Sequence, residues 1–145
     1  MTHKILKDHK IIALDTMVFI YYFENSSSFV SKIEKVLKDI EDRRLNAVTT
    51  VITLSEVLVR PLMEGDVELA DEYKNVINSF PNLRVLEINQ YIASIAASLK
   101  AKYKIKLPDA LQIAGALIGN ADLFLTNDKQ LKKIDEIKIV TIDQL

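Results

Sequence analysis

The feature that most constrains the fold is an alternation of short, continuous apolar runs with longer segments of helical periodicity. The runs suited to buried strands are 10–14, 47–51, 83–88, 123–125 and 137–142. Apolar residues recur at helical spacing over 16–23, 29–42, 53–63, 66–80, 92–103 and 108–120, with a short helix from about 129. Such alternation is typical of an α/β fold. We predict a three-layer sandwich around a mostly parallel sheet of about five strands, whose order the pattern leaves open.

Composition limits the class of protein. The chain has 145 residues, 49% of them hydrophobic and 27% charged, and only three glycines and three prolines, which predicts one globular domain over 1–145 with a polar N-terminal arm at 1–9. The longest apolar stretch, 11–23, is interrupted by Asp15 and is too short to cross a bilayer, so we expect no membrane partner. The lack of cysteine excludes disulfides and thiolate ligands and suits a reducing cytoplasm, where we expect the protein.

Four acidic residues stand at predicted strand ends or helix starts, each in a short motif. They are Asp15 in I-I-A-L-D-T, Glu56 in T-L-S-E-V-L, Asp109 in L-P-D-A-L and Asp128 in F-L-T-N-D-K. In a parallel sheet these positions meet at one edge. Carboxylates gathered at one point repel, and a divalent cation between them offsets that repulsion. The set therefore predicts a metal-dependent enzyme that acts on an anionic substrate.

Taken one at a time, each acid also has a structural explanation. Thr53 and Glu56 fit a capping box, Asp109 follows a proline in the first turn of a helix, and Asp15 and Asp128 fit the N-cap position. Asp15 is the hardest to explain in this way, because it ends an apolar run, and an acid at the edge of a core is costly unless it is paired or metal-bound.

The donor set also indicates a reaction. Carboxylate oxygens suit Mg²⁺ or Mn²⁺, and such an ion activates water and offsets the charge of a phosphodiester without a protein nucleophile. The sequence has no cysteine, no G-x-S-x-G elbow and no glycine-rich phosphate loop, and it has two histidines. Metal-dependent phosphodiester hydrolysis is the chemistry that remains.

These motifs, in this order, resemble those of the PIN-domain ribonucleases, and among them the VapC-type toxins of bacterial and archaeal toxin–antitoxin pairs. The matching segments are L-D-T, T-L-S-E-V-L-V-R-P-L, L-P-D-A-L-Q-I-A-G-A and A-D-L-F-L-T-N-D, so the resemblance covers nearly the whole chain. It implies a PIN-like fold and an endoribonuclease with one or two Mg²⁺ or Mn²⁺ ions. Attack by activated water would leave a 5′-phosphate and a 3′-hydroxyl.

The resemblance also implies roles for individual residues. Asp15 and Asp109 would be the direct metal ligands, and Glu56 and Asp128 would complete the site and orient the attacking water. Contacts to the substrate would come from Thr16, Thr126 and Asn127. Asn127 stands where relatives often carry arginine, which puts one substrate contact in doubt and leaves the metal set intact. An antitoxin protein and a second copy of the chain are the implied protein partners.

Two groups of basic residues flank this predicted site. Lysines alternate over 100–106 and recur over 129–133, where they would guide an RNA backbone or simply remain solvated. Arg60 stands four residues after Glu56, and a pair with Glu56, a contact with substrate and a surface position are all open.

Other functions fit the residues less well. An aspartyl-nucleophile phosphohydrolase generally has a second acid two positions after the first, where this chain has Met17. A phospho-receiver has an acidic pair at the end of its first strand, and here Leu14 precedes Asp15. A non-catalytic PIN-like binding module is expected to lack one of the four acids. An RNA-processing nuclease without an antitoxin would keep all four, so it stays open.

Overall fold

The sheet is entirely parallel. The structure is a computed structural model and describes residues 3–25 and 28–145. Across those residues five strands form one sheet in the order β3-β2-β1-β4-β5. Their bounds are Ile11–Leu14 for β1, Asn46–Thr50 for β2, Leu83–Leu86 for β3, Leu123–Thr126 for β4 and Lys138–Thr141 for β5. The predicted strand content and parallel direction are confirmed.

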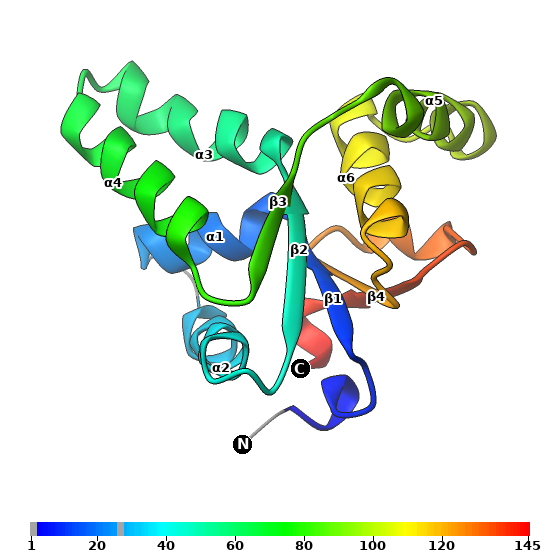
Figure 1. Ribbon diagram of the computed structural model, residues 1–145, viewed down its shortest axis with the longest axis horizontal. Coiled ribbons are helices and arrows are strands. Elements are labelled where there is room, and N and C mark those ends of the chain that lie inside the picture. The colour runs from blue at the N-terminus through cyan, green and yellow to red at the C-terminus, as the bar shows by residue number, and fades with distance from the viewer. Residues whose placement is uncertain (1–2, 26–27) are drawn as a thin grey trace.

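Helices cover both faces of the sheet, as the predicted three-layer sandwich requires. Their bounds are Thr16–Glu24 for α1, Val30–Glu41 for α2, Val51–Met63 for α3, Val67–Ser79 for α4, Gln90–Tyr103 for α5 and Leu107–Ile118 for α6. Figure 1 shows α1 to α4 on one side of the sheet and α5 with α6 on the other. Three short 3₁₀ helices lie at Lys4–Leu6 (η1), Lys129–Lys133 (η2) and Ile142–Gln144 (η3).

The start of α3 differs from the capping-box interpretation. The helix begins at Val51, and its N-cap is Thr50, whose hydroxyl accepts a hydrogen bond from the Ile52 amide at 3.1 Å. Thr53 therefore lies inside the first turn and is fully buried, so it does not cap the helix. The predicted break at 26–28 falls partly on Ser26 and Ser27, which lie outside the described residues.

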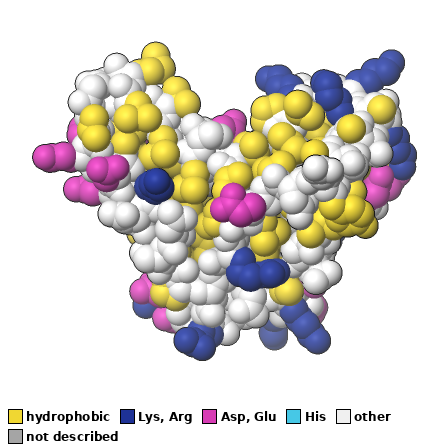
Figure 2. Space-filling model, turned by 45° about the horizontal axis from the view of Figure 1, so that its top comes forward, with side chains coloured by type: hydrophobic (Ala, Val, Ile, Leu, Met, Phe, Trp, Pro, Cys, Tyr) yellow, Lys and Arg dark blue, Asp and Glu magenta, His cyan; other side chains and the backbone are white. Residues whose placement is uncertain are grey.

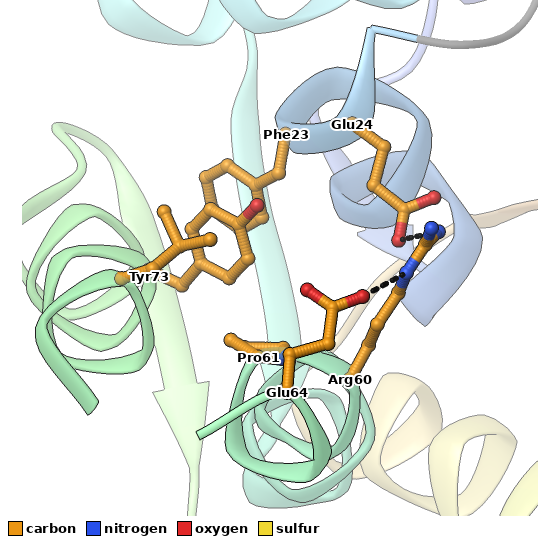
Figure 3. A pocket seen from close by; sticks show the side chains of 7 residues that line it. Phe23, Glu24, Arg60, Pro61, Glu64 and Tyr73 are labelled. Carbon is orange, nitrogen blue, oxygen red and sulfur yellow. Dashed lines mark hydrogen bonds and ion pairs between the residues drawn. The ribbon is translucent and has the colours of Figure 1, made fainter. Parts of the chain in front are cut away.

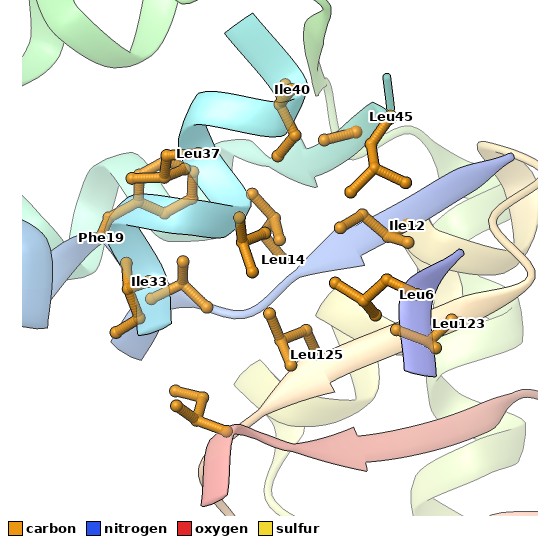
Figure 4. Close-up of a cluster of buried hydrophobic side chains, with 14 of the residues drawn as sticks. Leu6, Ile12, Leu14, Phe19, Ile33, Leu37, Ile40, Leu45, Leu123 and Leu125 are labelled. Carbon is orange, nitrogen blue, oxygen red and sulfur yellow. The ribbon is translucent and has the colours of Figure 1, made fainter. Parts of the chain in front are cut away.

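Each central strand buries both of its faces. In β1, Ile12 and Leu14 pack into the core under α1 and α2, which Figure 4 shows, whereas Ala13 between them packs into the core under α5 and α6. Phe124 of β4 likewise faces the second core. A strand with two buried faces must be apolar at successive positions, which is why these strands appear as continuous runs rather than as alternating patterns.

The strand order creates a crevice at the carboxyl ends of β1 and β4. From β1 the chain passes to β2 and β3 on one side, and β4 and β5 are then added on the other side. Adjacent strands thus continue into connections that leave in opposite directions, and ligands of α/β proteins bind at such a switch point. Leu14 and Leu125 are paired here, so the residues that follow them emerge side by side.

The N-terminal segment packs against the fold. Leu6, in η1, is fully buried in the core beside Ile12, and the His9 ring lies 3.2 Å from a carboxylate oxygen of Asp122. Among the residues described, none of the helices is both long enough and apolar enough to span a membrane.

Candidate active site

Asp15 lies where β1 ends and α1 begins. Its backbone amide donates to the Leu125 carbonyl at 2.9 Å, which extends the β1–β4 pairing by one residue. Its side chain is 7% exposed and accepts two hydrogen bonds, from the Thr16 amide at 2.8 Å and from the Thr126 hydroxyl at 2.7 Å. Asp15 is therefore an N-cap, and its carboxylate is also held at the switch point.

Glu56 reaches the same place from α3. Thr16 Oγ1 donates to Glu56 Oε1 at 2.7 Å, so a residue of α1 holds a carboxylate that belongs to another helix. The Glu56 side chain is otherwise exposed. The start of α1 thus carries one carboxylate, that of its N-cap Asp15, and holds a second, that of Glu56, through Thr16.

The remaining two acids come from α6 and from the loop after β4. Asp109 lies in the first turn of α6, as predicted, and is half-buried. Asp128 caps η2 by accepting from the Gln130 amide at 2.9 Å, while its own amide donates to the Thr126 hydroxyl at 3.1 Å. The Thr126 hydroxyl therefore connects Asp15 and Asp128.

All of these side chains line one pocket. Its volume is about 480 Å³, and its walls are Asp15, Thr16, Met17, Ile20, Glu56, Lys106, Pro108, Asp109, Thr126, Asn127 and Asp128. The seven residues predicted from the sequence as catalytic, metal-binding or substrate-binding are all among them. Figure 2 shows two lobes, formed by α3–α4 and α5–α6, with hydrophobic side chains on their facing sides and acidic groups in the middle.

The pocket is an unfavourable environment for the ionised forms of Asp15 and Asp109. The pKa of Asp15 is raised from 3.8 to about 6, chiefly by burial; hydrogen bonds from Thr126 and Thr16 partly oppose the rise, and the charges of Asp109 and Glu56 add to it. Burial also raises the pKa of Asp109, as do the charges of Asp128 and Glu56, while Lys106 lowers it. The neighbouring carboxylates thus disfavour the ionisation of Asp15 and of Asp109.

Lys106 lines the same pocket, but among the described residues it forms no ion pair with any of the four acids. In the parts of the chain that the structure describes, none of the four carboxylates forms an ion pair with a lysine, arginine or histidine. Within those same parts, no three Asp, Glu, His or Cys side chains are placed so that they could hold a metal ion as they stand. The oxygen donors and their mutual repulsion fit a hard divalent cation, and enclosing one requires the exposed carboxylates to turn inward.

The lysines near the site divide into two sets. Lys100 donates to the Ile105 carbonyl at 2.9 Å, and Lys102 pairs with Glu136 at 3.4 Å, so both serve the local structure. In contrast, Lys104, Lys106 and Lys133 line an adjoining cavity of about 270 Å³ that shares Asp109 and Asp128 with the acidic pocket. A basic surface therefore runs up to the site from one side.

Arg60 does not pair with Glu56. Its guanidinium lies 3.0 Å from Glu24 of α1 and 3.3 Å from Glu64, one turn further along α3, as Figure 3 shows. The side chain is 68% exposed, so of the interpretations left open by the sequence the surface position is the one observed. Arg60, Glu24 and Glu64 line a separate cavity. Phe23 and Tyr73 also line it, and their rings stack on each other with 4.2 Å between centroids.

Sequence reasoning missed a buried polar layer beneath the pocket. Gln112 of α6 is 3% exposed and bonds to Thr16, Thr53 and Thr50. The signal was present, because a glutamine that interrupts the apolar face of L-Q-I-A-G-A must find partners. Asn127 also has an unforeseen partner, donating to the Tyr21 hydroxyl at 2.6 Å.

Comparison with known proteins decides the family. The model of the PIN domain matches residues 12–137, which contain all four acids. The chain belongs to the PIN domain family. Among curated proteins, none matches it at a significant level.

Solved structures show the same fold at low sequence identity. VapBC2 from Rickettsia felis, bound to a promoter DNA fragment, superposes with a TM-score of 0.72 at 16% identity, covering 90% of this chain and 98% of that one. A toxin–antitoxin complex from Klebsiella pneumoniae gives 0.68 at 22% identity, covering 90% and 97%. VapC20 from Mycobacterium tuberculosis, a toxin that cleaves the sarcin–ricin loop, gives 0.68 at 12% identity, covering 88% and 98%. The predicted PIN-like fold is confirmed.

Proposed function

We propose that this PIN-domain protein is a divalent-metal-dependent endoribonuclease and the toxin of a toxin–antitoxin pair. The observation that carries the proposal is the set Asp15, Glu56, Asp109 and Asp128, which lines one pocket at the switch point and forms no ion pair among the described residues. Capping explains the positions of Asp15 and Asp128 singly, but it does not explain why four acids share one pocket.

Each residue then has a role in the reaction. Asp15 and Asp109 would hold one or two Mg²⁺ or Mn²⁺ ions, because burial, and then the charges of neighbouring carboxylates, raise the pKa of each, and a cation would offset both effects. Glu56 and Asp128 complete the site and orient the attacking water. The ion, when bound, supplies water activation and neutralises charge on the phosphate and the leaving oxygen. Thr126 holds Asp15 in place, and Asn127, fixed by its bond to Tyr21, contacts the phosphate.

The substrate class follows from the charge distribution around the pocket. Lys104, Lys106 and Lys133 form a basic surface that adjoins the acids, whereas the net charge of the chain is −1. A polyanion that approaches from that side meets positive charge beside the site, which favours a nucleic-acid backbone over a small phosphate ester. We assign RNA because the structural neighbours include a toxin that cleaves the sarcin–ricin loop.

Protein partners are supported by exposed apolar side chains at the free end of the α3–α4 lobe. Val59, Leu62, Met63 and Val67 are 51%, 52%, 81% and 60% exposed. Apolar side chains gathered in this way mark protein interaction sites. Because the neighbours include toxin–antitoxin complexes, we assign this lobe to contacts with an antitoxin and with a second copy of the chain.

The test is cleavage of a mixed pool of structured RNAs by the purified protein with Mg²⁺, Mn²⁺ or EDTA. We expect cutting that EDTA abolishes, and no cutting by the Asp15→Asn variant. Arg60→Ala is the matched control, since it removes a charge from an exposed side chain that lines a different cavity. Cleavage that survives both EDTA and Asp15→Asn would refute the assignment. Growth arrest on expression, relieved by the protein encoded next to it, separates a toxin from an RNA-processing nuclease.

A further inference from the structure

A connected layer of hydroxyls and one amide lies directly beneath the acidic pocket. Gln112 Nε2 is 3.0 Å from Thr16 Oγ1 and 2.8 Å from Thr53 Oγ1, and Gln112 Oε1 is 2.6 Å from Thr50 Oγ1. Thr49 Oγ1 extends the layer, 2.7 Å from Thr53 Oγ1. All five side chains are 4% exposed or less, so solvent does not compete for these bonds.

The direction of each hydrogen bond in this layer follows from counting protons. Thr49 gives its one hydroxyl proton to the Leu14 carbonyl at 2.9 Å, so the Thr49–Thr53 bond must be donated by Thr53. Thr50 donates to Gln112 Oε1, which fixes the orientation of the amide. Both Nε2 protons of Gln112 are then directed at the threonines of α1 and α3.

These donor assignments leave one acceptor for the Thr16 hydroxyl proton. Thr16 Oγ1 receives a proton from Gln112, and the neighbouring Thr53 hydroxyl, 3.3 Å away, has already given its own proton to Thr49. The Thr16 proton therefore goes to Glu56 Oε1, at 2.7 Å. Among the described residues this is the only hydrogen bond that the Glu56 carboxylate accepts.

Close packing of α6 on β2 is what brings Gln112 within reach. Gly115 lies about one turn further along α6, and a Cβ atom there would be 2.3 Å from Thr50 Cγ2. The absence of a side chain at Gly115 thus allows Thr50 to reach the amide of Gln112. The sequence places glutamine and glycine on the same helix, where they serve the same contact.

We infer that Gln112 is a positioning residue of the site: through Thr16 it sets the direction in which Glu56 presents its carboxylate to the pocket. The inference rests on the proposed function for its catalytic meaning, whereas the ordering of Glu56 does not depend on it. Groups that orient metal ligands in this way typically change metal affinity or activity by about 10–100-fold when removed.

The test compares Gln112→Met, which keeps the length of the side chain and removes its hydrogen bonds, with Ile113→Val on the same helix. Ile113 is fully buried, and its side chain has no polar atom that could join the hydrogen-bonded layer, so its variant controls for loosened packing. We expect the Mn²⁺ dissociation constant, measured by calorimetry, to rise about 10–100-fold in Gln112→Met and to stay near the wild-type value in Ile113→Val. For RNA cleavage we expect a lower kcat with KM unchanged.

Coupling to Thr16 distinguishes positioning from general stability. If Gln112 acts through Thr16, the double variant Thr16→Val with Gln112→Met binds Mn²⁺ no more weakly than Thr16→Val alone. Additive losses would overturn the inference. Gln112→Glu, which keeps the shape and has no amide protons to donate, provides a second variant should Gln112→Met fail to fold, and the same weakening is expected for it.

Side-chain NMR of Glu56 tests the positioning role of Gln112 without an activity assay. We expect Glu56 to lose rotamer order in Gln112→Met and to keep it in Ile113→Val. Unchanged order in both variants would overturn the inference even if the enzyme is active. A wild-type protein that neither binds Mn²⁺ nor cuts RNA would overturn the proposed function, while the NMR comparison would still decide the role of Gln112.

Discussion

Replacing Asp15 with asparagine should stabilise the metal-free protein while abolishing its activity. Asparagine is as good an N-cap as aspartate, so the bond from the Thr16 amide survives. What the substitution removes is a charge that is 7% exposed and faces Asp109 and Glu56. The expected result is therefore the opposite of that for an ordinary capping residue, whose loss costs about 0.5–2 kcal/mol.

The size of the effect follows from the pKa of Asp15. The pKa of the Asp15 carboxyl rises from 3.8 to about 6 on folding. Since a shift of one pKa unit corresponds to about 1.4 kcal/mol, the ionised carboxyl destabilises the folded state by about 3 kcal/mol. The stability that neutral Asp15 contributes is fully present below about pH 3.8 and is lost as the pH rises through about 6. Asparagine stays neutral throughout, so the variant lacks this decline.

A divalent cation should reverse the order of stability. An ion at 100 times its dissociation constant stabilises the protein that binds it by about 2.7 kcal/mol. The wild-type protein gains this term, and Asp15→Asn, which lacks a charged ligand, gains little of it. The free energy of unfolding should thus be higher for Asp15→Asn in EDTA and higher for the wild-type protein in Mn²⁺.

Urea denaturation at pH 5 and pH 7.5, with EDTA or Mn²⁺, measures all of these terms. We expect Asp15→Asn to be the more stable protein at pH 7.5 in EDTA, with a smaller advantage at pH 5. Arg60→Ala is again the control and should show neither dependence. A variant that is less stable than wild type at pH 7.5 in EDTA would show that Asp15 is a structural cap, and the reasoning would fail.

Three further predictions concern the surroundings of the site. Gly115→Ala should lower the free energy of unfolding in urea, because overpacking against Thr50 costs about 1–3 kcal/mol and the gain in helix propensity is at most about 1 kcal/mol. Thr126→Val should weaken Mn²⁺ binding by about 10–100-fold in calorimetry, since it removes the hydroxyl that holds Asp15; unchanged affinity would contradict this. Lys106→Ala should reduce the salt dependence of RNA binding by about one charge, and an unchanged slope would exclude Lys106 from the RNA path.

The strands and the acids were predictable because local sequence determines them. A strand buried on both faces must be a continuous apolar run, so β1 and β4 were visible in the sequence. Asp15 and Asp128 follow those runs directly, and the parallel sheet brings both to one edge. Glu56 and Asp109 were expected at the same edge because they lie near the starts of helices, and the structure places both in the same pocket. The family resemblance added the roles of the four acids.

Side-chain partners were not predictable, because they come from distant parts of the chain. Gln112 bonds to residues 62, 96 and 59 positions away, and no local pattern marks such partners. Arg60 had acids both one turn before and one turn after it on α3, and Glu24 of α1 decides between them. The start of α3 was misplaced because both Thr50 and Thr53 are plausible caps, and burial of Thr53 selects Thr50.

The most direct test of the central claim is a crystal structure of the wild-type protein soaked with Mn²⁺, with an anomalous difference map calculated at the manganese edge. The account predicts a peak in the pocket that contacts the carboxylates of Asp15 and Asp109, and no such peak in Asp15→Asn crystals treated in the same way. Manganese bound elsewhere on the molecule, with this pocket empty at saturating Mn²⁺, would contradict the account.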